Sequence, residues 1–150
     1  MAYRTMLTAI TCLISAIAAP AAAQEAPTII PFETLKWNPT PFPDVTVAVI
    51  AGNPAGTGIY AIFAKYRAGG TSAPHTHPDQ RVVTVISGTY YAGAGTEFDK
   101  SKLRPLKPGT TINVPANTPH YAAAKHGETI VQEVGVGPSG TNIWPKAGTK

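Results

Sequence analysis

Length, composition and charge limit what this chain can be. Its 150 residues carry a formal net charge of +4, and only 13% of them are charged. The lysines and arginines are scattered, without a basic cluster or interleaved aromatic residues, which argues against nucleic-acid binding. Cys12 is the single cysteine, so the chain cannot form an internal disulfide and its stability must come from packing.

The first 23 residues have the pattern of a secretory signal peptide. Arg4 gives a positive start, residues 6–19 form an apolar stretch, and three alanines end at position 23. The apolar stretch is shorter than the roughly 20 residues of a membrane-spanning helix. We therefore expect residues 1–23 to be removed and the mature chain to begin near Gln24, in the periplasm or secreted, with no membrane anchor. The remainder has the size of one domain.

Residues 24–44 are predicted to form an extended, proline-rich arm. Prolines at positions 27, 31, 39, 41 and 43 exclude a helix and remove hydrogen-bond donors from any strand. The arm also carries apolar residues, which indicates that it lies against a surface. That surface is either its own barrel or a neighbouring subunit of a homodimer.

Residues 45–145 are predicted to form one β-barrel domain. Short runs of β-branched and aromatic residues alternate there with Gly, Pro and Asn, the pattern of an all-β sandwich or barrel. We expect residues 93–106 to be a surface loop with one helical turn around 98–103. The expected strands are residues 45–50, 59–67, 81–86, 89–92, 110–114, 120–124 and 129–136.

The sequence Pro74-His75-Thr76-His77-Pro78 is the segment most indicative of chemistry. In an extended segment, side chains two residues apart project to the same face, so His75 and His77 lie side by side. Neutral imidazole is a common ligand of transition metals, and such a pair supplies half of a metal site. A chance pair on a solvated loop is the alternative, so further residues are needed to decide.

Two blocks of residues supply that context. The first has the spacing G-x5-H-x-H-x10-G and the second G-x5-P-x-N-x2-H; their residues are Gly69, His75, His77 and Gly88, then Gly109, Pro115, Asn117 and His120. Together they resemble the two sequence motifs of the cupin superfamily. The resemblance implies an all-β, single-domain cupin jelly-roll β-barrel. It also implies that His75, His77 and His120 converge on one divalent transition metal ion, Fe, Zn, Mn, Ni or Cu.

One position departs from the cupin pattern. Cupins usually carry a carboxylate ligand four residues after the second histidine, where this chain has Arg81. A guanidinium group has no acceptor lone pair, so Arg81 cannot be a ligand, and it repels a cation if it points inward. By parity it shares the face of Val83 and Val85.

Three alternatives follow from this departure. In the first, Arg81 turns outward and leaves a three-histidine metal site open to water or substrate. In the second, Gln80 turns inward as a weak fourth ligand. In the third, no metal binds, and Arg81 and the three histidines form a pocket in which Arg81 grips an organic anion.

Other polar residues have simpler interpretations. Gln132 alternates with Ile130 and Val134, so its amide is expected either to face the cavity or to make a structural hydrogen bond. Asp79 is expected to be an exposed turn residue, and His126 a surface residue in a hairpin-like turn. Three tyrosines are expected in the core: Tyr60, Tyr66 and Tyr91.

The sequence thus predicts an exported cupin that binds a divalent metal and acts on or recognises a small organic molecule. If it is an enzyme, the metal acts as a Lewis acid or holds O2, as in an oxygenase. The alternative is a non-catalytic, metal-free cupin that binds a small organic anion as a sensor or binding module. The pattern does not select a reaction or a substrate.

Overall fold

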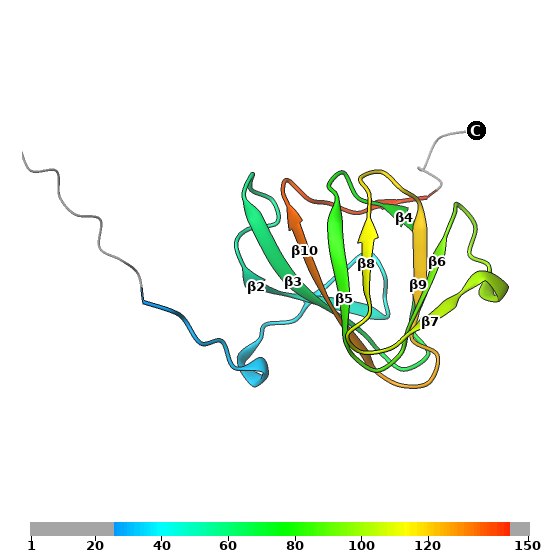
Figure 1. The fold of residues 1–150 in the computed structure, drawn as a ribbon, viewed down its shortest axis with the longest axis horizontal. Coiled ribbons are helices and arrows are strands. Elements are labelled where there is room, and N and C mark those ends of the chain that lie inside the picture. The colour runs from blue at the N-terminus through cyan, green and yellow to red at the C-terminus, as the bar shows by residue number, and fades with distance from the viewer. Residues whose placement is uncertain (1–25, 145–150) are drawn as a thin grey trace, which may run out of the picture.

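The structure is a computed structural model that describes residues 26–144; the predicted signal peptide, residues 1–23, lies outside the described residues. Two antiparallel sheets make up the molecule (Figure 1). The strands are β1 (Asn38–Pro39), β2 (Val45–Ala51), β3 (Ile59–Tyr66), β4 (Thr71–Thr76), β5 (Arg81–Ser87), β6 (Tyr90–Ala94), β7 (Arg104–Leu106), β8 (Thr111–Val114), β9 (His120–Ala123), β10 (Thr129–Val136) and β11 (Asn142–Ile143). Two short 3-10 helices are η1 (Phe32–Thr34) and η2 (Lys100–Lys102).

The strand order explains how the two sheets enclose one core. The six-stranded sheet runs β1-β2-β3-β10-β5-β8, and the five-stranded sheet runs β11-β4-β9-β6-β7. Buried residues of both sheets pack in one cluster, among them Val83 and Val85 of the first sheet and Ala122 of the second. The all-β barrel expected from the sequence is therefore confirmed.

Alternating burial shows why these segments become strands. In β3, Tyr60, Ile62, Ala64 and Tyr66 are all buried, and the residues between them are more exposed. This period of two puts one face of the strand in the core. Within residues 26–144 there is no helix long and apolar enough to cross a membrane.

One expected loop is partly strand. Residues 104–106 lie in the segment predicted to be a surface loop, but they form β7, which pairs with β6 at Tyr90, Tyr91 and Ala92. The prediction was wrong there because β7 is short and contains Pro105, which suits an edge strand but gives no periodic signal. The helical turn expected nearby is present as η2.

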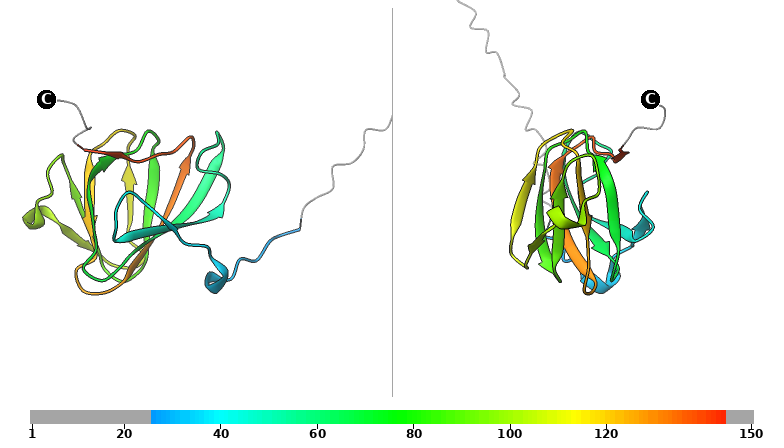
Figure 2. Two further views of the ribbon diagram at one scale, coloured as in Figure 1. Left: turned by 180° about the vertical axis from the view of Figure 1, so that it is seen from behind. Right: turned by 90° about the vertical axis from the view of Figure 1, so that its right-hand side faces the viewer.

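The proline-rich arm contacts its own barrel from Phe32 onward. Phe32 packs against Phe63 with ring centres 6.0 Å apart, and the ammonium group of Lys65 lies 4.0 Å from the ring centre of Trp37. Phe42 is buried in the core. Residues before the arm's 3-10 helix lead away from the barrel (Figure 2), and Ile29 is 88% exposed.

Candidate metal centre

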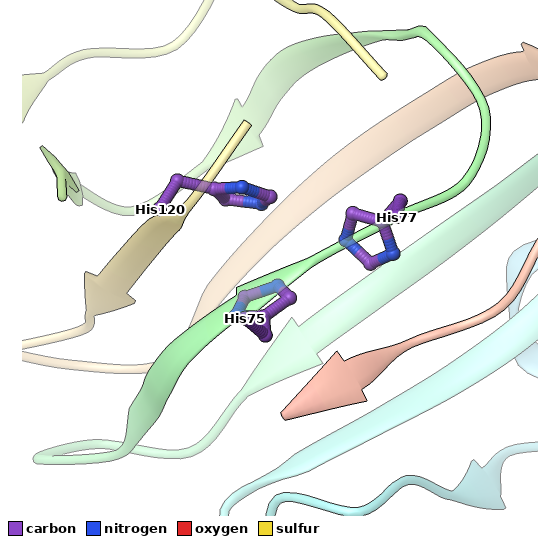
Figure 3. Close-up of side chains that lie close together, drawn as sticks. All are labelled: His75, His77 and His120. Carbon is purple, nitrogen blue, oxygen red and sulfur yellow. The ribbon is translucent and has the colours of Figure 1, made fainter. Parts of the chain in front are cut away.

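Strand pairing brings the three predicted metal ligands together. His75 on β4 lies directly opposite His120 on β9, and His77 follows two residues after His75. The ring centres are 4.2 Å apart for His75 and His120, 4.8 Å for His75 and His77, and 5.2 Å for His77 and His120. Figure 3 shows the three imidazoles grouped around a common point. One ring nitrogen from each lies within 4.8 Å of the others.

The backbone fixes which ring nitrogen of each histidine is free. The Nδ1 atoms of His75, His77 and His120 lie 2.7, 2.6 and 2.9 Å from the carbonyl oxygens of Ala73, Gly140 and Thr118, respectively. A carbonyl oxygen only accepts hydrogen bonds, so each Nδ1 carries the proton and donates it. Each Nε2 is then left with a bare lone pair. This is the arrangement that commonly orients histidine ligands in metal sites.

The protonation state of the rings also suits a metal. Burial and the neighbouring His120 lower the pKa of His75 to about 3. Burial and the charge of Arg81 lower the pKa of His77 to about 4, and burial lowers the pKa of His120 below its ordinary value. All three rings are therefore neutral at pH 7, as metal ligands must be. The donor set fits a divalent transition metal ion such as those expected from the sequence.

Segments distant in sequence hold the histidines in place. The backbone N–H of Asn117, in the turn before His120, donates to the carbonyl oxygen of His77 at 2.7 Å. Asn117 has a φ of 58°, in the left-handed region that Asn tolerates better than most residues. On the other side, β11 pairs with β4 at Thr76 and His75. The two motifs and β11 are therefore joined around the histidines by backbone contacts.

Arg81 points inward, on the face that it shares with Val83 and Val85, as parity predicted. Its side chain is 3% exposed, and both of its terminal nitrogens bind carboxylates. Nη1 donates to Glu133 Oε2 at 2.8 Å, and Nη2 donates to Asp79 Oδ1 at 2.7 Å and to Ser139 Oγ at 2.7 Å. The alternative with Arg81 turned outward is therefore wrong. An organic anion at Arg81 has to compete with two carboxylates of the protein.

Asp79 is buried, which corrects the expectation of an exposed turn residue. Its Oδ2 accepts a hydrogen bond from the Tyr60 hydroxyl at 2.6 Å while Oδ1 binds Arg81. Burial raises the pKa of Tyr60 to about 12, and its hydrogen bond to Asp79 acts in the same direction, so Tyr60 stays a donor. No local pattern predicts the burial of Asp79, because a Pro-Asp-Gln turn is commonly exposed.

Neither amide proposed for the site lies with the histidines. Gln80 is exposed, and its Nε2 donates to Asn113 Oδ1 at 3.1 Å. Gln132 lies on the opposite face of β10 from Val131, Glu133 and Gly135. The residue of β10 that lines the cavity is Glu133. Gln132 shares its face with Ile130 and Val134 as expected, but that face points outward. β10 pairs with β3 in unbroken register, and it is Glu133, not Gln132, that lies opposite the buried Ile62.

A cavity of about 680 Å³ adjoins the histidines. Its wall includes His75 and His120 together with Arg81 and Glu133, and most of the remainder is apolar or aromatic. Two exposed cationic residues, Lys102 and Arg104, also border it. The volume is that of a pocket for a small organic molecule.

The other residues singled out from the sequence lie outside the histidine cluster. His126 is exposed in the turn before β10, as predicted. Tyr60 and Tyr66 are buried, as expected of core residues, whereas Tyr91 is only partly buried beside Lys125.

Comparison with known proteins agrees with this architecture. A family model described as a cupin domain matches residues 62–132. No curated protein matches the sequence. Because all the solved structures compared below are less than 25% identical to this chain, the likeness shows the fold alone.

Three solved structures illustrate the likeness. The polyketide cyclase RemF from Streptomyces resistomycificus is 16% identical, with a TM-score of 0.62 over 73% of this chain and 78% of its own. A cupin 2 conserved barrel domain protein from Rhodopseudomonas palustris is 18% identical, with a TM-score of 0.58 over 72% and 71%. A cupin-superfamily sugar phosphate isomerase from Silicibacter pomeroyi is 13% identical, with a TM-score of 0.59 over 73% and 76%. Residues 62–132 thus match a cupin domain, and the barrel that contains them has the fold of solved cupin structures.

Proposed function

We propose that this protein is an exported cupin that binds one divalent transition metal ion through His75, His77 and His120. In this proposal it acts on, or recognises, a small organic molecule held in the adjoining cavity. Export is inferred from the signal-peptide pattern of residues 1–23.

The observation that carries the metal proposal is the common state of the three imidazoles. Each is neutral, and each donates its Nδ1 proton to a backbone carbonyl. If the three histidines packed together for structural reasons alone, there would be no need for every one of them to leave its Nε2 atom free. A metal ion bound by three neutral nitrogens keeps positions open for a ligand and supplies Lewis-acid chemistry there.

The chain's own residues give the cavity its character. Apolar and aromatic walls exclude water from a bound molecule, and Lys102 and Arg104 at the border favour a molecule that carries negative charge. A metal-free function as an anion-binding module is less favoured. Arg81, the residue that was expected to bind the anion, already binds Asp79 and Glu133. The similar folds include a cyclase and an isomerase, so the fold does not select a reaction.

Elemental analysis tests the proposal. Protein purified without chelator and then dialysed is expected to carry close to one transition metal ion per chain. Chelation should remove the ion, and added zinc should restore it and raise the melting temperature, because a ligand that binds only the folded state stabilises it. Metal well below stoichiometry, together with no thermal response to zinc, manganese, iron, nickel or copper, would falsify the proposal.

A further inference from the structure

The residue at the usual carboxylate position belongs to a buried group of three charges. Arg81 lies between Asp79 and Glu133, at 2.7 and 2.8 Å from their carboxylate oxygens. Two carboxylates and one guanidinium leave this charged trio with one net negative charge. That is the charge that a single carboxylate ligand contributes to a cupin metal site.

Within the trio, Glu133 is the member most open to the cavity. Its side chain is 12% exposed, against 3% for Arg81 and for Asp79. Asp79 has both carboxylate oxygens hydrogen-bonded, whereas only Oε2 of Glu133 has a partner among the described residues. Glu133 is also the sole acidic residue among the described residues that line the cavity.

The negative charge of Glu133 reaches the histidines. Glu133 lines the same cavity as His75 and His120, so its carboxylate lies beside the site. At His120 the charge of Glu133 outweighs that of Arg81, whereas at His77 the charge of Arg81 is the larger influence on the pKa. A divalent ion bound by three neutral imidazoles keeps its full charge of +2. Away from bulk water, the net negative charge of the trio attracts that ion more strongly than it would in water.

We propose that Glu133 on β10 supplies the negative charge of the metal centre that a ligand carboxylate at position 81 supplies in other cupins. Asp79 neutralises Arg81, and Arg81 in turn holds Glu133 beside the cavity. Glu133 acts through its charge on the ion and does not bond to it in the arrangement observed. This inference rests on the proposed metal site.

Zinc titration of the chelator-treated protein by competition calorimetry tests the assignment. Glu133→Gln keeps the shape of the side chain but leaves the trio neutral, and it should weaken zinc binding by roughly 10- to 100-fold, the range found for groups that support metal ligands. Glu128→Gln removes the same charge from the exposed turn before β10 and should leave zinc binding unchanged. Arg81→Gln raises the net negative charge of the trio and should tighten zinc binding, measured at a temperature at which this less stable variant is shown by circular dichroism to be folded.

The opposite signs separate an electrostatic role from general damage, because a damaged fold weakens binding in both variants. If Glu133→Gln does not fold, the zinc affinity of Arg81→Gln relative to wild type tests the inference instead. Zinc binding equal in Glu133→Gln and wild type, or weaker in Arg81→Gln, overturns the inference while leaving the metal site intact. Absence of zinc binding in wild type refutes the proposed function instead.

Discussion

Arg81 shows how a charge is accommodated inside this barrel. The guanidinium group is buried together with two carboxylates, a Ser139 hydroxyl and, through Asp79, the Tyr60 hydroxyl. Each terminal nitrogen has an acceptor, which offsets much of the desolvation of the charge. Nε of Arg81 is buried without a partner among the described residues. A buried ion pair tolerates loss of one member poorly, since the remaining charges keep their desolvation cost.

Loss of Arg81 should therefore destabilise the metal-free protein. Arg81→Gln leaves Asp79 and Glu133 as neighbouring buried carboxylates, and the free energy of unfolding should fall by about 3–5 kcal/mol. Arg67→Gln is the matched control: Arg67 pairs with Asp44 at the surface with its side chain 70% exposed, so the loss should be below about 1 kcal/mol. Urea unfolding of both variants measures the difference. Similar losses would contradict the buried trio.

The histidines make the stability of the metal-free protein depend on pH. The pKa values of His75 and His77 are about 3 and about 4 in the fold, against about 6.5 in the unfolded chain. Between these values the unfolded state binds more protons, so stability is complete above about pH 6.5 and falls as the pH drops toward 4. Arg81, Glu133 and His120 surround His77, and Glu133 partly opposes the shift.

The urea midpoint of chelator-treated protein should accordingly fall between pH 7.5 and pH 5. His77→Asn removes one titrating ring and keeps a donor near the carbonyl of Gly140, so its midpoint should fall less steeply over the same range. A wild-type midpoint that is flat across this range, or a variant with the same slope, would mean that the rings are not buried in the neutral form.

At the scale of the strand, β10 gives the site its acid. β10 pairs with both β3 and β5, and Val131, Glu133 and Gly135 face inward because each lies opposite a buried residue of β3. Gly135 lies opposite Arg81 in the pairing of β10 with β5. A Cβ atom at that position would lie 2.6 Å from the Tyr60 hydroxyl and 2.8 Å from Asp79 Oδ2. The strand thus needs glycine there in order to pack against this hydrogen bond.

Gly135→Ala is expected to lower the free energy of unfolding by about 1–3 kcal/mol, the range for overpacking of a buried site. Gly58→Ala offers a matched control, because a Cβ atom at Gly58 meets nothing within 4 Å and its backbone needs no positive φ. Its effect should stay within about 0.5 kcal/mol. Chemical denaturation compares the two; equal effects would show that β10 has room for a methyl group beside Tyr60.

Predictability differed between local and long-range features. The longer strands were predictable because β-branched and aromatic residues recur along them, whereas β1, β4, β7 and β11 were not predicted as strands. The histidines were predictable because His75, His77 and His120 lie in short motifs with fixed spacing. The burial of Asp79 and the position of Glu133 were not predictable, since they depend on Arg81 meeting β10 across the sheet. The pairing of β11 with β4 was missed for the same reason.

At the scale of the whole molecule, the barrel begins well after the amino terminus. The arm contacts the barrel from Phe32 onward, and Phe42 packs against His75 with ring centres 4.8 Å apart. The segment from Phe32 to Phe42 therefore supports the site, whereas residues 1–23 are expected only to direct export. Removal of residues 1–23 should leave the barrel and its site complete.

The mature protein should begin at or next to Gln24. Intact mass spectrometry of protein recovered from the periplasm or the medium is expected to show the loss of residues 1–23. Recovery of the unprocessed chain in the membrane fraction would show that the segment is an anchor.

Calorimetric zinc titration of three chelator-treated proteins tests whether His75, His77 and His120 form one metal site. Wild type and His126→Ala should each bind one ion per chain with the same affinity, because His126 is exposed and outside the cluster. His77→Ala removes one of three ligands and should bind at least about tenfold more weakly. Equal binding by His77→Ala and His126→Ala would contradict the account.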